Sequence, residues 1–111
     1  MRDLAAMKKD NFLDFVLEQM DAFGGVRARA MFGGHGLYQR EVFFGIVHKR
    51  RLYFKTDEAT RPRYAARGME AFCPKPGMTL KTYYEVPEDV LESTRELAVW
   101  ASEAVQVTRR K

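Results

Sequence analysis

The sequence predicts a single α+β domain in which helices pack against an antiparallel β-sheet. Apolar residues recur with helical spacing near both ends of the chain, and they alternate with polar residues in short runs through the middle. The length of 111 residues suits one core and leaves no room for a second domain. With 46% hydrophobic and 31% charged residues, the chain can bury a core and stay soluble.

The N-terminal helix is predicted over residues 10–23. Phe12 and Val16 belong to an apolar stripe that repeats every three to four residues. Asp10 is placed to cap the start, and Gly24 and Gly25 supply the left-handed residue that commonly ends a helix.

Four short strands follow the helix, and their brief polar connections predict an antiparallel meander. In the first strand, Val26 and Ala28 alternate with Arg27 and Arg29, which is the period of a half-buried strand. The glycine run at 33–36 lies between strands, so a tight turn or bulge is favoured over a phosphate cradle. The predicted strands are 26–32, 37–38, 42–47 and 51–55.

The second half of the chain predicts two helices and two strands. A short helix at 57–67 has Asp57 or Thr60 as its cap and Gly68 as its terminator. Pro74 requires a strand at 69–73 to be short or to lie at a sheet edge, and a better strand covers 82–86. The last helix opens at Pro87, and the basic tail at 108–111 is expected to be frayed.

Positive charge is concentrated in the middle of the chain. Residues 24–67 carry ten Lys and Arg against three acids, whereas the remaining residues carry nine against twelve. A basic segment of this kind attracts acidic partners, although solvated charge explains many such runs.

Strand parity predicts where that charge gathers. The apolar residues of strands 26–32 and 51–55 must face the core. If both strands belong to one sheet, the residues that alternate with these apolar residues within each strand all face the other side. These strands would lie about 14 Å apart in a meander. The alternative is that long side chains merely cover the sheet or pair with nearby acids. The predicted contact surface for an acidic partner comprises Arg27, Arg29, Arg51, Tyr53 and Lys55.

Catalysis, cofactors and metals are not indicated. Cys73 adjoins Phe72 in an apolar context typical of a small buried thiol, and one cysteine with His35 and His48 is a poor metal-ligand set. No cofactor loop, transmembrane segment or signal peptide is evident, so we expect a cytoplasmic protein that is not an enzyme.

Several separated blocks of sequence resemble the TfoX (Sxy) N-terminal domain family, and the likeness spans roughly residues 11–104. The blocks appear in the family's order, and Arg67-Gly68-Met69 and Phe72 fall between the last two of them. They are Met31-Phe32-Gly33-Gly34-His35-Gly36-Leu37-Tyr38, Phe44-Gly45-Ile46-Val47, Leu52-Tyr53-Phe54-Lys55-Thr56-Asp57 and Tyr83-Tyr84-Glu85-Val86-Pro87.

The resemblance implies a compact α+β domain similar to secretion-chaperone-like folds. Full-length TfoX proteins are competence regulators that act with a cyclic-AMP receptor protein at promoters, and they carry a second, helical domain. We expect this chain to be a free-standing N-terminal domain. The turn at 39–41 lacks the family's Asp-Gly pair.

Together these observations predict a TfoX-like module that acts in transcription-linked regulation through a protein partner in the transcription machinery. The alternative is a domain that binds nucleic acid directly with a basic sheet face, and a more remote one is a small-molecule-binding protein or enzyme. We also expect self-association as a homodimer, because helices on one side of a sheet leave its other face or an edge available.

Overall fold

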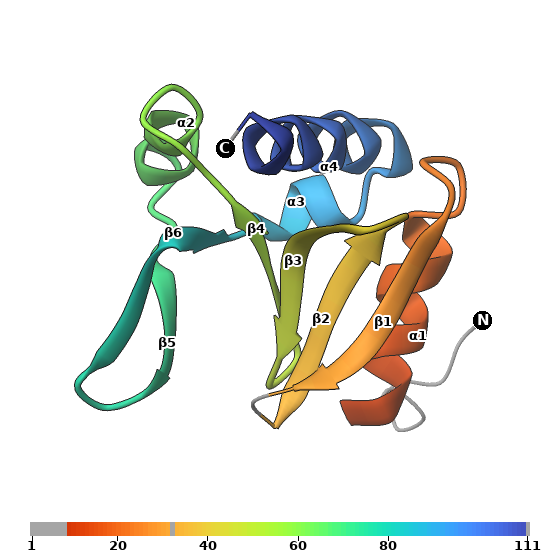
Figure 1. The fold of residues 1–111 in the computed structure, drawn as a ribbon, viewed down its shortest axis with the longest axis horizontal. Coiled ribbons are helices and arrows are strands. Elements are labelled where there is room, and N and C mark those ends of the chain that lie inside the picture. Colours follow the sequence, from red (N-terminus) through yellow and green to blue (C-terminus); the bar gives the residue numbers. More distant parts are fainter. Residues whose placement is uncertain (1–8, 32, 111) are drawn as a thin grey trace.

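The computed structural model describes residues 9–31 and 33–110, which form a six-stranded sheet and four helices (Figure 1). The strands are β1 (Val26–Met31), β2 (Gly34–Gln39), β3 (Val42–His48), β4 (Arg51–Lys55), β5 (Ala71–Lys75) and β6 (Met78–Glu85). The helices are α1 (Lys9–Gln19), α2 (Arg61–Ala66), α3 (Glu88–Leu91) and α4 (Thr94–Arg109). The predicted α+β class is confirmed.

The strand order is β1-β2-β3-β4-β6-β5, and every neighbouring pair is antiparallel. The first four strands form the predicted meander. After α2 the chain returns with β5 and β6, and β6 pairs with β4 so that β5 lies at the far edge. Pro74 is in β5, where its missing N–H is tolerated because the strand has a partner on one side only.

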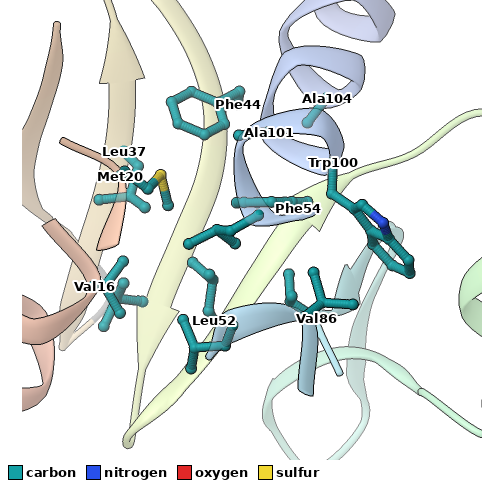
Figure 2. Packing of buried hydrophobic residues seen from close by; sticks show 14 of the residues in the cluster. Val16, Met20, Leu37, Phe44, Leu52, Phe54, Val86, Trp100, Ala101 and Ala104 are labelled. Carbon is teal, nitrogen blue, oxygen red and sulfur yellow. The ribbon is translucent and has the colours of Figure 1, made fainter. Parts of the chain in front are cut away.

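The main core lies on the side of the sheet that the helices cover (Figures 1 and 2). Figure 2 shows Val16 of α1 close to the strands and Trp100 of α4 beside Val86. Leu37 of β2 and Phe54 of β4 are fully buried in the same cluster. This packing explains the apolar stripes of both helices, since each stripe covers the sheet.

Side-chain alternation is regular in β4 and less regular in β1. Leu52 and Phe54 face the main core, and Tyr53 faces the opposite side, as predicted. In β1, Val26 and Ala28 are half-buried, but Ala30 is exposed, which corrects the expectation that the apolar residues of this strand are all buried. A residue on an edge strand has sheet neighbours on one side only, and this reduces its burial. Phe32, also predicted to face the core, lies outside the described residues.

The face opposite the helices has a small apolar cluster of its own. Phe72 of β5 packs against Tyr53 with ring centroids 4.6 Å apart, and its ring meets that of His48 at 5.2 Å. Phe72 of the edge strand β5 therefore covers Tyr53 of β4, with β6 between these two strands in the sheet. Burial, together with the positive charge of Lys49, lowers the pKa of His48.

The predicted C-terminal helix is two helices, which is a correction. A break at Glu92 and Ser93 separates α3 from α4. The Oγ of Ser93 accepts a hydrogen bond from the backbone N of Glu96 at 3.2 Å and so caps α4. A serine followed by a glutamate three residues later is a known start signal for a helix, and it was present in the sequence.

Three further boundaries differ from the sequence prediction. The helix α1 ends at Gln19, four residues early, and Asp10 lies inside it instead of capping it. The chain leaves this region through Gly24, whose φ of 88° is left-handed as predicted. Within the glycine run, the turn is at Gly33, while residues 34–36 belong to β2: Gly34 pairs with β1, and residues 35–36 pair with both β1 and β3.

The basic C-terminal segment is ordered through residue 110, which corrects the expectation of a frayed tail. Residue 109 still belongs to α4, and Arg110 binds the Asp57 carboxylate at 2.9 Å. This contact, with backbone hydrogen bonds near Thr60, lowers the pKa of Asp57 to about 2. Lys111 lies outside the described residues. None of the described helices is long and apolar enough to cross a membrane.

Candidate contact surface

A row of aromatic rings crosses the sheet face that the helices leave uncovered. Tyr38 of β2 stacks on Phe43 of β3 with centroids 5.1 Å apart and an angle of 24° between the rings. Phe43 then meets Tyr83 of β6 at 5.7 Å. All three side chains are half-buried, so the row forms a surface and not a second closed core.

Positive groups lie at both ends of this row. The guanidinium of Arg29 lies over the Tyr38 ring at 5.6 Å, and the Nζ of Lys55 lies 5.1 Å from the centroid of Tyr83. Each pair has the geometry of a cation–π contact. The surface formed by Arg29, Tyr38, Phe43, Tyr83 and Lys55 is called the ring row below.

The protonation of the row is set by its packing. Burial, and to a lesser extent the neighbouring Tyr38, raises the pKa of Tyr83 to about 12. The Tyr83 phenol is therefore neutral near pH 7, and the two end cations are not offset by a phenolate. The Nζ of Lys55 also donates a hydrogen bond to Oγ1 of Thr82 at 3.2 Å, which helps to fix its position.

The structure brings three of the five predicted contact residues to the exposed part of this face. Arg29 and Lys55 belong to the ring row. Arg27 pairs in register with Tyr38 and donates a hydrogen bond to the backbone O of Arg40 at 2.9 Å. β1 and β4 have two strands between them, as the meander predicted.

The other two predicted residues have different environments. Arg51 binds both carboxylate oxygens of Glu85, at 2.9 and 3.0 Å, so its charge is already paired. Tyr53 lies on the expected side of the sheet but is only 8% exposed beneath Phe72. The expectation that Tyr53 offers its ring to a partner is therefore corrected, because β5 folds over it.

Sequence reasoning did not select Tyr38 and Phe43 as members of the surface. The β2–β3 register pairs Leu37 with Gly45 but Tyr38 with Phe43, so Phe44 has no partner and forms a bulge. Adjacent residues of a strand face opposite sides, so Phe44 enters the main core while Phe43 joins the opposite face. Two adjacent phenylalanines in a predicted strand signalled that both faces are apolar here.

The surroundings of Cys73 differ from the sequence prediction. Cys73 is exposed, which corrects the expectation of a buried thiol, and its Sγ donates to the backbone O of Lys75 at 3.1 Å. A hollow of about 290 Å³ beside Cys73 is also lined by Arg51 and Glu85 but by no histidine. Within residues 9–31 and 33–110, no group of three or more His, Cys, Asp or Glu could hold a metal ion.

These features define a small module that combines a helix-covered core with a cationic, aromatic sheet face. The sequence model of the TfoX N-terminal domain matches residues 18–108 of the chain. Because this match spans most of the 111 residues, the chain belongs to the TfoX N-terminal domain family, and the resemblance seen in the sequence is confirmed. Membership places it among competence-related regulatory domains. A search of curated proteins finds no match to the chain.

Proposed function

We propose that this chain is a non-catalytic regulatory module that acts in transcription-linked regulation by binding an acidic partner protein on its helix-free sheet face. The observation that carries the proposal is the ring row, an aromatic strip with a cation at each end. Half-buried aromatic rings flanked by cations are typical of surfaces that bind a partner. The family supports a regulatory role.

The stacking within the row favours an acidic protein over single-stranded nucleic acid. Bases bind aromatic side chains through open ring faces. Here the ring of Tyr38 already stacks on Phe43 and lies beneath the guanidinium of Arg29, so it is less open to a base. The cations at the two ends of the row also suit carboxylates.

The proposal is tested by removing two of the positive charges on this sheet face and comparing the result with a matched control variant. The variant Arg27→Gln/Arg29→Gln changes β1, and Arg95→Gln/Arg109→Gln removes the same charge from exposed positions on α4. Each tagged protein is used to capture partners from extract of its own cells, with bound protein and nucleic acid identified together. A competence-gene reporter is measured in parallel.

We expect the β1 variant to lose partner capture and reporter activation while the α4 variant keeps both. Both proteins should melt within a few degrees of the parent, because exposed substitutions cost little, typically within about 0.5 kcal/mol each. Equal capture by all three proteins would refute the role of the sheet face. If the captured partner is nucleic acid, and its affinity falls steeply with salt, direct nucleic-acid binding replaces the protein partner.

A further inference from the structure

The outer edge of β1 is the more regular of the two sheet edges. Its register with β2 runs without a break from Val26 opposite Gln39 to Met31 opposite Gly34. Among the described residues, no strand pairs with β1 on its other side. An unbroken edge presents backbone N–H and C=O groups in the spacing that another extended chain can match.

The opposite edge of the sheet is built differently. The pairing of β5 with β6 shifts register twice, between Ala71 and Phe72 and again between Phe72 and Lys75. Pro74 also removes one N–H from this strand. Such irregularities are the usual protection of an edge against added strands, and β1 has neither of them.

Charge on β1 selects what can pair with it. Arg27 and Arg29 are exposed and lie on the face of the ring row. On an added strand, the side chains directly opposite and diagonal to these arginines would sit within contact distance. Acidic side chains are attracted at those positions, and a basic strand is repelled.

The other face of the same edge holds an apolar hollow. It has a volume of about 260 Å³ and lies between the end of α1 and the start of β1, lined by Leu17, Met20, Gly24 and Val26. Asp21 and Arg27 also line it, and the carboxylate of Asp21 disfavours an acidic side chain there. Because side chains of a strand alternate between faces, one set of an added strand would meet the arginines and the other set would meet this hollow.

We propose that the β1 edge binds an extended segment of the partner protein in which acidic and apolar residues alternate. The segment adds a seventh strand, its acidic side chains face Arg27 and Arg29, and an apolar side chain enters the hollow beside Leu17. This inference rests on the proposed function and names the partner's chemistry and mode of binding.

The test uses a fluorescein-labelled octapeptide that alternates Glu with Leu, and its affinity is measured by fluorescence anisotropy. Two further peptides carry N-methyl groups on all Glu or on all Leu residues. In an added strand, the backbone N–H groups of alternate residues point toward β1 and the others point away. The N–H groups of either the Glu or the Leu residues therefore bond to β1, and only the peptide methylated on that set should lose binding. The loss of about three backbone hydrogen bonds predicts a weakening of roughly a hundredfold.

Protein variants separate the two faces of the edge. Arg27→Glu/Arg29→Glu should weaken the peptide about tenfold, and Arg27→Gln/Arg29→Gln should weaken it less, whereas Arg95→Glu on α4 should leave it unchanged. Leu17→Trp fills the hollow and should reject the Leu peptide while accepting one that alternates Glu with Ala. Hydrogen exchange of the β1 amides should slow when the parent binds.

The outcomes distinguish this inference from the proposed function. If both N-methylated peptides bind as well as the parent peptide, or if no peptide binds, then strand addition at β1 is wrong. The sheet face is judged separately, by partner capture with the Gln variants. A single-stranded oligonucleotide that binds and displaces the peptide, with loss in the Glu variant, would also overturn the inference in favour of nucleic acid.

Discussion

Gly34 is the position where one added methyl group should cost the most. A Cβ built on Gly34 comes closer than 3.0 Å to the backbone O of Val47 in β3, a distance that real Cβ atoms essentially never show. Val47 is 5% exposed and belongs to the main core, so its strand cannot move away freely. Overpacking of this kind typically costs about 1–3 kcal/mol, and the backbone overlap puts Gly34→Ala at the upper end. At about 4 °C per kcal/mol, the melting temperature should fall by roughly 12 °C.

The matched control is Gly36→Ala, two residues along the same strand. Its Cβ would meet Sδ of Met31 at 2.5 Å and Cε1 of Phe43 at 3.0 Å; both are side-chain atoms and not backbone, and the flexible Met31 side chain can turn aside. Neither glycine has a positive φ, so both variants gain the same small benefit from a stiffer unfolded chain. Urea unfolding of the parent and both variants measures the difference. The reasoning is refuted if Gly34→Ala is as stable as Gly36→Ala.

Three other outcomes follow from single side chains. Ser93→Ala should lower the free energy of unfolding by about 1 kcal/mol by removing the cap of α4, and urea curves that coincide with the parent's would contradict this. Tyr83 should ionise at about pH 12 in a spectrophotometric titration, and this step is assigned to Tyr83 because it should be missing from the titration of Tyr83→Phe. Because that pKa is raised above the ordinary value of 10, the contribution of Tyr83 to stability is complete below pH 10 and declines between pH 10 and 12. Cys73 should react with a thiol reagent in the folded protein, and a need for denaturant would show that it is not exposed.

The sequence alone predicted those parts of the fold in which apolar and polar residues alternate with the period of one helix or strand. Strand β4 was predicted residue for residue, since alternation at Leu52 and Phe54 follows directly from one buried face. The position of β6 beside β4 was not predicted, because a pairing across the whole of α2 leaves no local pattern. The division of the last helix was missed although Ser93 and Glu96 carry a local signal.

The sequence predicted on which face of the sheet the candidate surface lies, but it did not predict all of the residues that form the surface. Parity placed Arg29 and Lys55 on the correct face. It also placed Tyr53 there but did not predict its burial, because that depends on Phe72 of a distant strand. It was applied only to strands 26–32 and 51–55, so it did not select Phe43 of β3.

The arginines of β1 also bear on the predicted homodimer, which stays a prediction. If two copies paired their β1 edges antiparallel around Ala28, Arg27 of each chain would stand opposite Arg29 of the other. Like charges directly opposite one another destabilise a strand pair, so the same side chains that attract an acidic segment repel a second copy. The β5 edge is closed to regular pairing by its register shifts and Pro74. Self-association, where it occurs, should therefore use a face of the module and leave β1 available for the partner.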